Sequence, residues 1–209
     1  MTLTSNSIDL KKEFSELARK DPILARAIDL TGIPEPRKYV SGYAALLRII
    51  ISQQVSNSAG AAIWKKLDDH ARGVTADKIC RFNDKTLRKC GLSRSKVKYA
   101  KITANAVCKG ELDLKQLESL SDELVRSKLI SYKGIGPWTA EVYLMFALKR
   151  PDVFPSGDLA LAISVKDLLH LDVKPNPNEL ATIAERWRPY RSAAATLLWQ
   201  YYKYLSQMG

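Results

Sequence analysis

Apolar residues recur at helical spacing in one segment of the chain after another, and this periodicity restricts the fold more than any other feature. Residues 9–20 place Leu10, Phe14 and Leu17 on one helical face, and residues 93–109 repeat the pattern. The alternation with a period of two that a half-buried strand requires is nowhere convincing. The sequence therefore predicts an all-α fold.

Prolines, glycines and N-capping residues divide this helical chain into short elements. The expected helices span residues 9–20, 22–30, 41–52, 57–70, 76–81, 84–90, 93–109, 121–131, 137–149 and 190–206, with a further helix starting at Asp158. Pro175, Pro177 and Pro189 interrupt the stretch before the last helix. We find no repeat of fixed period and no low-complexity tract, so a globular helical protein is expected.

The charge of the chain favours a polyanionic partner. Its 209 residues carry 33 Lys and Arg against 22 Asp and Glu, a formal net charge of +11. Nucleic acid is the first candidate, because each phosphate contact gains from counterion release. A ribosome-associated protein, or a basic protein of another kind, would have the same composition. The sequence contains no apolar run that could span a bilayer, so we expect an intracellular protein without membrane contact.

The stretch Lys133-Gly-Ile-Gly-Pro-Trp138 joins two predicted helices through a tight turn. Gly134 and Gly136 can adopt positive φ and let the backbone approach a ligand closely. Pro137 suits the first turn of the following helix, whose N-terminus attracts anions. An ordinary corner between two helices would use its glycines in the same way, so the turn alone does not establish a phosphate site.

Asp158 follows this turn by about twenty residues, in the segment Asp152-Val-Phe-Pro-Ser-Gly-Asp158. It is expected to cap the helix that begins there, and a carboxylate at a helix N-terminus stays ionised. A fixed negative charge is also what stabilises the cationic sugar that forms when an N-glycosidic bond breaks. Helix capping and catalysis are both compatible with this position.

Together, the turn and the spaced aspartate resemble the helix–hairpin–helix (HhH-GPD) superfamily of DNA glycosylases. The resemblance covers roughly residues 43–204 and implies a hairpin that grips one DNA backbone, with Asp158 as the catalytic residue. In this superfamily the hairpin often holds a cation through main-chain carbonyls, which implies Na⁺ or K⁺ at Ile130, Tyr132 and Ile135. No other cofactor is expected.

Three features resemble the alkylpurine branch, the 3-methyladenine DNA glycosylase II type. Trp138 occupies the position at which strand-cleaving members carry a Schiff-base lysine, so a monofunctional hydrolase is implied. The iron–sulfur branch needs four closely spaced cysteines near its end, whereas the last of the three cysteines here is Cys108. Ile49-Ile-Ile-Ser-Gln-Gln-Val-Ser56 and Trp187-Arg-Pro-Tyr-Arg-Ser192 complete the likeness.

These matches assign expected roles to individual residues. Gln54 would fill the gap left by a flipped nucleotide, with Gln53 and Ser56 beside it in the minor groove. Electron-rich aromatic rings would stack on a cationic base such as 3-methyladenine or 7-methylguanine. The expected base pocket comprises Trp138, Trp199, Tyr143 and Phe146. The expected phosphate contacts are Gly134, Gly136, Thr139, Arg94 and Lys96. A polar helix end would explain the glutamines equally well, core packing would explain Tyr143 and Trp199, and a solvated face would explain Arg94 and Lys96.

The resemblance thus implies an all-α, two-lobed fold with a cleft between the lobes. Residues 38–149 would form one lobe with the hairpin, and residues 1–37 with 150–209 the other, carrying Asp158. The expected protein is a monomer that excises alkylated purines from double-stranded DNA in base excision repair, in the nucleus of a eukaryote or the cytoplasm and nucleoid of a bacterium.

Two alternatives remain open at this stage. The first is a catalytically weak or inactive relative that binds abasic or damaged DNA, for which the small residues Ala147 and Ala160 near the expected pocket are the motive. The second is a helix–hairpin–helix module that serves another enzyme as a DNA-binding scaffold. Base release, abasic-DNA binding and the need for Asp158 and Trp199 distinguish these alternatives.

Overall fold

The computed structural model describes residues 10–35 and 41–208, and within these ranges the regular structure is helical throughout. The chain forms two compact units, one from residues 1–38 and 151–209 and the other from residues 39–150. The expected boundary between residues 37 and 38 lies outside the described residues, and the expected boundary between 149 and 150 is one residue from the break. No described helix is long and apolar enough to cross a membrane.

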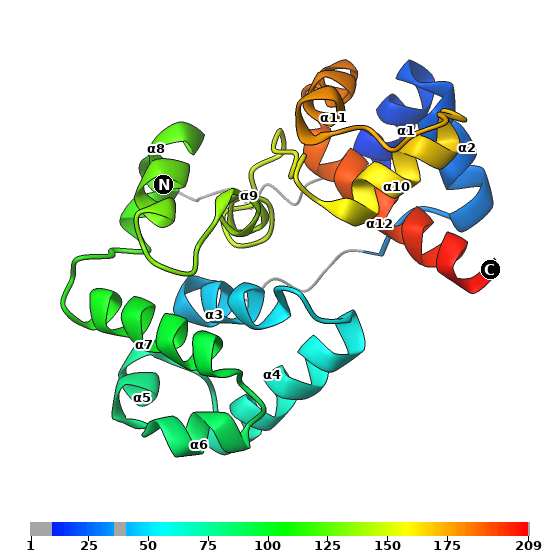
Figure 1. Ribbon diagram of the computed structural model, residues 1–209. Coiled ribbons are helices and arrows are strands. Elements are labelled where there is room, and N and C mark those ends of the chain that lie inside the picture. The colour runs from blue at the N-terminus through cyan, green and yellow to red at the C-terminus, as the bar shows by residue number, and fades with distance from the viewer. Residues whose placement is uncertain (1–9, 36–40, 209) are drawn as a thin grey trace. The chain divides into compact units, whose positions relative to one another are not determined.

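The unit of residues 39–150 is built around one apolar helix, α3. Its helices are α3 (Gly42–Ser52), α4 (Asn57–Ala71), α5 (Ala76–Arg81), α6 (Asp84–Lys89), α7 (Arg94–Cys108), α8 (Asp122–Ile130) and α9 (Pro137–Phe146), with a 3₁₀ turn η1 (Gln116–Ser119) before α8. Helix α3 packs against α4, α7 and α9 (Figure 1). Leu46, Leu47, Ile50 and Ile51 are completely buried, as expected of a helix that is apolar on several faces.

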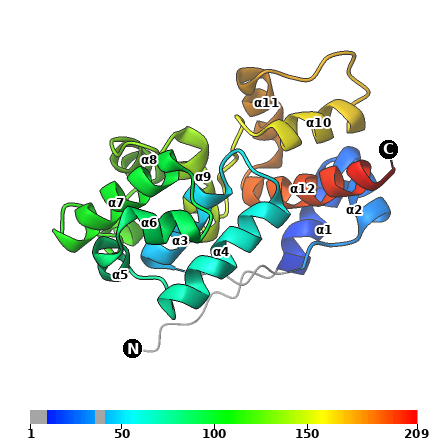
Figure 2. The same ribbon diagram turned by 60° about the horizontal axis from the view of Figure 1, so that its bottom comes forward.

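The second unit is centred on the last helix. It contains α1 (Leu10–Lys20), α2 (Pro22–Thr31), α10 (Leu159–Leu168), α11 (Pro177–Ala184), the 3₁₀ turn η2 (Glu185–Trp187) and α12 (Arg191–Met208). Helix α12 packs against α1, α2 and α10 (Figure 2). Asp21 joins the two chain segments of this unit, because it caps α2 by accepting from Ile23 N and also accepts from the indole Nε1 of Trp187 at 2.9 Å.

Most predicted helices are confirmed to within a few residues, and two differences have clear causes. The helix predicted over residues 137–149 ends at Phe146. Lys149 adopts a left-handed φ of 55°, and Arg150 N donates back to Leu144 O, so the chain turns away from the helix axis. Helix α11 was not predicted, although Asn176 and Glu179 form a capping box around Pro177 that the sequence displays.

Candidate functional site

The hairpin between α8 and α9 is held in place by a close backbone approach at Gly134. This glycine has a φ of 97°, and a Cβ added to it would lie 2.2 Å from Cγ of Tyr99 on α7. The aromatic ring therefore packs directly on the glycine backbone, which only a residue without a side chain allows. The sequence indicates no role for Tyr99, because nothing local to this residue shows which backbone its ring will contact.

Gly136 does not share this constraint, which corrects the expectation of positive φ at both glycines. It lies at the N-cap of α9 with a φ of −98°, and a Cβ there would meet nothing within 4 Å. Its contribution is to start α9 without a capping side chain, and Pro137 follows at the first helical position. The N–H groups of a first helical turn lack partners within their own helix, and anion binding at this N-terminus stays a prediction.

Two side chains that were expected at the DNA bond each other instead. Gln53 directs its side-chain amide at the hairpin, donating to Gly134 O at 2.9 Å and to Thr139 Oγ1 at 2.8 Å. Thr139 is only 2% exposed. The expectation of a minor-groove contact by Gln53 is therefore wrong for its side-chain amide, which is used within the unit. The phosphate contact expected at Thr139 stays a prediction, since its backbone N–H lies in the first turn of α9.

Lys96 is likewise not placed for a phosphate. The residue is 8% exposed, and its Nζ donates to Ile51 O at 2.6 Å and to Gln53 O at 2.9 Å. Burial lowers the pKa of this ammonium. The predicted phosphate contact is wrong, since the charged group bonds the carbonyl end of α3 inside the unit.

The remaining residues predicted around this hairpin lie at the surface or in its turn. Gln54 and Arg94 are exposed, and Gln54 has a left-handed φ of 54°. Ser56 is exposed as well and caps α4 by accepting from Ala59 N. The expected cation ligands lie at the end of α8 and in the turn that follows it, where Tyr132 O accepts from Ile135 N at 3.1 Å.

The predicted base pocket draws on both units. Trp138 and Phe146 on α9 are partly exposed, whereas Tyr143 on the same helix is 1% exposed. Burial raises the pKa of the Tyr143 phenol to about 12, so it stays neutral. Trp199 lies on α12 in the other unit and is partly exposed. A pocket that joins all four rings stays a prediction.

Asp158 caps α10, as the sequence predicted. Its Oδ1 accepts from Ala160 N at 2.9 Å and from Leu161 N at 3.1 Å, with the side chain partly exposed. These two donors orient the carboxylate at the start of α10.

The segment leading to Asp158 is fastened to the start of α12. Arg191 donates from Nε to Asp152 Oδ1 at 2.8 Å and from Nη2 to the carbonyl of the same residue at 2.8 Å. Ser192 Oγ exchanges hydrogen bonds with both the N–H and the C=O of Val153. Arg191 and Ser192 of the Trp187–Ser192 motif therefore hold the loop that leads to Asp158. The motif alone did not reveal this role.

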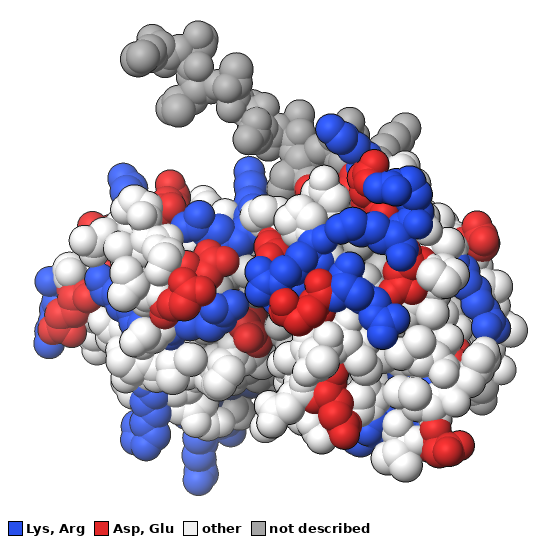
Figure 3. Space-filling model, turned by 90° about the horizontal axis from the view of Figure 1, so that it is seen from above, with Lys and Arg blue, Asp and Glu red and all other residues white. Residues whose placement is uncertain are grey.

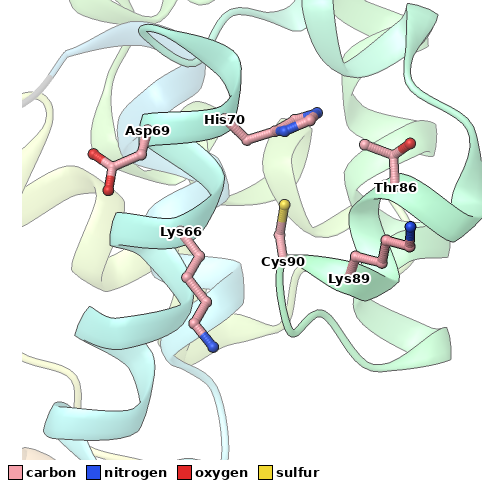
Figure 4. Close-up of a pocket in the computed structure, with 6 residues that line it drawn as sticks. All are labelled: Lys66, Asp69, His70, Thr86, Lys89 and Cys90. Atoms are coloured by element: carbon pink, nitrogen blue, oxygen red, sulfur yellow. The ribbon is translucent and has the colours of Figure 1, made fainter.

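The surface has two further features. A hollow of about 500 Å³ lies between α4 and α6, lined by Lys66, Asp69, His70, Thr86, Lys89 and Cys90 (Figure 4). None of the predicted site residues lines it.

On one face of the molecule, Lys and Arg side chains lie interspersed with Asp and Glu (Figure 3). Within the described part of the chain, no group of three or more His, Cys, Asp or Glu is arranged to hold a metal.

The hairpin between α8 and α9 packs on α7, and an aspartate caps the helix that follows. This arrangement is that of a helix–hairpin–helix protein of the glycosylase type. Residues 47–189 match the family model of the HhH-GPD superfamily of base excision DNA repair proteins. The chain belongs to this superfamily, as the sequence predicted.

Named relatives support this membership over most of the chain. DNA-3-methyladenine glycosylase 1 of Schizosaccharomyces pombe is 31% identical over 198 residues, which span 91% of this chain and 87% of that protein. The DNA-3-methyladenine glycosylase of Bacillus subtilis is 30% identical over 206 residues, covering 90% of this chain and 66% of the longer bacterial protein. The structure of the S. pombe 3-methyladenine DNA glycosylase in complex with abasic DNA is 30% identical and superposes with a TM-score of 0.85, covering 90% of this chain and 95% of that one. The all-α helix–hairpin–helix fold is thereby confirmed.

Proposed function

We propose that this chain is a monofunctional DNA glycosylase, which hydrolyses the bond between an alkylated purine and deoxyribose in duplex DNA and leaves an abasic site. The relatives named as 3-methyladenine glycosylases and the abasic-DNA complex support the substrate class. The observation that carries the chemistry is the Asp158 carboxylate, fixed at the start of α10 by two N–H donors. A protein that acts on DNA works in the nucleus of a eukaryote or in the nucleoid of a bacterium.

Breaking the glycosidic bond shifts positive charge from the base to the sugar. As the C1′–N bond breaks, its electron pair leaves with the base, so a cationic N3- or N7-alkylpurine departs neutral. Positive charge develops on the sugar, where the Asp158 carboxylate stabilises it. Water then forms the new C1′–O bond and loses a proton to the carboxylate or to solvent. Trp138 offers no amine nucleophile, which agrees with hydrolysis without strand cleavage.

DNA binding is assigned to the unit of residues 39–150. The N-terminus of α9 would bind a backbone phosphate, Arg94 a second one, and Gln54 the gap that the extruded nucleotide leaves. The aromatic rings of Trp138 and Trp199 would stack on the cationic base. The carbonyls of Ile130, Tyr132 and Ile135 would hold a monovalent cation, since a carbonyl that accepts one hydrogen bond keeps a second lone pair.

The test compares Asp158→Asn with the wild-type protein on duplexes containing 3-methyladenine, 7-methylguanine, ethenoadenine or hypoxanthine. Asparagine caps a helix as well as aspartate does, so the variant should fold and bind abasic DNA normally. Base release should fall by about 100-fold or more. Asp172→Asn, which removes an exposed charge from the same unit, serves as the matched control.

The outcomes separate the candidate functions. Near wild-type base release by Asp158→Asn would remove this residue from the mechanism. A wild-type protein that binds abasic DNA tightly but releases none of the four bases would instead be the inactive relative. Weak, lesion-independent binding without base release would indicate a scaffold module.

A further inference from the structure

The loop between α3 and α4 carries Gln54, and a buried lysine of another helix fixes the residues that precede it. Lys96 on α7 donates from Nζ to the carbonyls of Ile51 and Gln53. Both carbonyls lie at the C-terminal end of α3, where the last C=O groups have no partner within their own helix. A charged donor supplies two bonds there, in the orientation that the helix dipole favours.

The same helix also supports the hairpin. Tyr99 lies three residues after Lys96, which places both on one face of α7. Its ring packs on Gly134 of the hairpin, while Gln53 bridges from the loop to Gly134 O and Thr139 Oγ1. One face of α7 therefore holds the loop and the hairpin in a fixed relation.

Gln54 itself is held in an unfavourable conformation. Its φ of 54° is left-handed, and its side chain is exposed. Such a backbone costs on the order of 1 kcal/mol for a residue other than glycine and persists only where its surroundings impose it. The preceding carbonyl, that of Gln53, is one of the two that Lys96 binds.

We propose that Lys96 is a positioning residue, whose buried ammonium sets Gln54 in register with the phosphate-binding hairpin so that both DNA contacts engage together. This inference rests on the proposed function for the role of Gln54. Burying an ammonium is costly without strong hydrogen bonds, and the two carbonyls offset that cost. The lysine acts through the loop and does not touch DNA.

The test is a double-mutant cycle on binding to duplex DNA with an abasic site. Lys96→Met keeps the length of the side chain and removes its donors, and Gln54→Ala removes the side chain that fills the gap. We expect each change to weaken binding about tenfold and the double variant to weaken it about tenfold as well, because both remove one interaction. Effects that multiply to about 100-fold would overturn the proposal.

Lys98→Met is the matched control, since Lys98 lies exposed on the same helix. Its effect should multiply with that of Gln54→Ala. The salt dependence gives a second readout, because loss of a phosphate contact lowers the slope of log Kd against log salt by about 0.9. Lys96→Met should leave this slope unchanged, and a drop of about 0.9 would show that the lysine binds phosphate after all.

Base release separates this inference from the proposed function. With Lys96→Met, release of 3-methyladenine should slow more in a fully paired duplex than opposite a mismatch, because extrusion from a mismatch costs less and depends less on Gln54. If the wild-type protein released no base while the binding cycle showed coupling, the proposed function would fail and the positioning role would stand. Lys96→Gln keeps two N–H donors without the charge and should weaken binding less than Lys96→Met does. If Lys96→Met does not fold, Lys96→Ala replaces it in the same cycle, and multiplicative effects there would also overturn the proposal.

Discussion

At the scale of single residues, the two hairpin glycines differ in what they tolerate. Gly134→Ala would force a Cβ to within 2.2 Å of the Tyr99 ring at a φ of 97°. The free energy of unfolding should fall by more than about 1 kcal/mol, and affinity for abasic DNA should fall with it. Urea titrations and binding to an abasic duplex measure the two effects.

Gly136→Ala provides the comparison for that substitution. The backbone φ of −98° suits any L-residue, and nothing lies within 4 Å of the added methyl group. Its unfolding free energy should stay within about 0.5 kcal/mol of the wild type. Equal losses at both positions would show that the contact between Tyr99 and Gly134 does not control the hairpin.

At the scale of elements, a partly buried carboxyl group on α9, that of Glu141, lies beside Arg126 of α8. Burial raises the pKa of Glu141 to about 7, although Arg126 on α8, with Nε 3.8 Å from Oε1, opposes the shift. The ordinary value is 4.5, so between pH 4.5 and 7 the folded protein keeps a proton that the unfolded chain has lost. Stability therefore falls as the pH rises through this window.

Glu141→Gln should remove that pH dependence, because glutamine is neutral throughout. Relative to wild type, the variant should gain up to about 3 kcal/mol of unfolding free energy at pH 8 and much less at pH 5. Chemical denaturation at the two pH values measures the difference. The exposed Glu111→Gln is the control, and a gain for Glu141→Gln that is the same at both pH values would contradict the assigned pKa.

The helices also show which sequence signals were sufficient to predict their positions. Helical periodicity, breakers and caps are local, and they located α1 to α10 and α12 closely. The end of α9 was missed because the turn at Lys149 depends on a bond between Arg150 N and Leu144 O that periodicity does not encode. Helix α11 was missed for a different reason: its capping box is visible in the sequence, but a proline both interrupts helices and suits the first position of one, as Pro177 does here.

At the scale of the whole molecule, the net charge of +11 should make DNA binding strongly dependent on salt. Raising the salt from 50 to 200 mM should weaken binding to an undamaged duplex by at least about tenfold, as counterions are released from several phosphates. Arg94→Met should lower the slope of log Kd against log salt by about 0.9. Fluorescence anisotropy across a salt series measures both quantities.

Lys65→Met is the control for that measurement, because Lys65 lies on α4 in an exposed ion pair with Asp69 at 2.6 Å. It removes the same net charge from the molecule. If both substitutions changed the slope equally, binding would follow overall charge and Arg94 would have no specific phosphate contact.

The sequence by itself determined the all-α class, the superfamily, the hairpin and the capping role of Asp158. These follow from local periodicity and from a motif whose spacing is set along the chain. The tertiary structure decided which polar side chains bond within the protein. The Gln53 amide bonds the hairpin and the Lys96 ammonium bonds the end of α3, although both were expected at the DNA. A lysine in a basic stretch reads as a surface charge until another helix end supplies carbonyls for it, and such a pairing between residues far apart in the chain leaves no local signal.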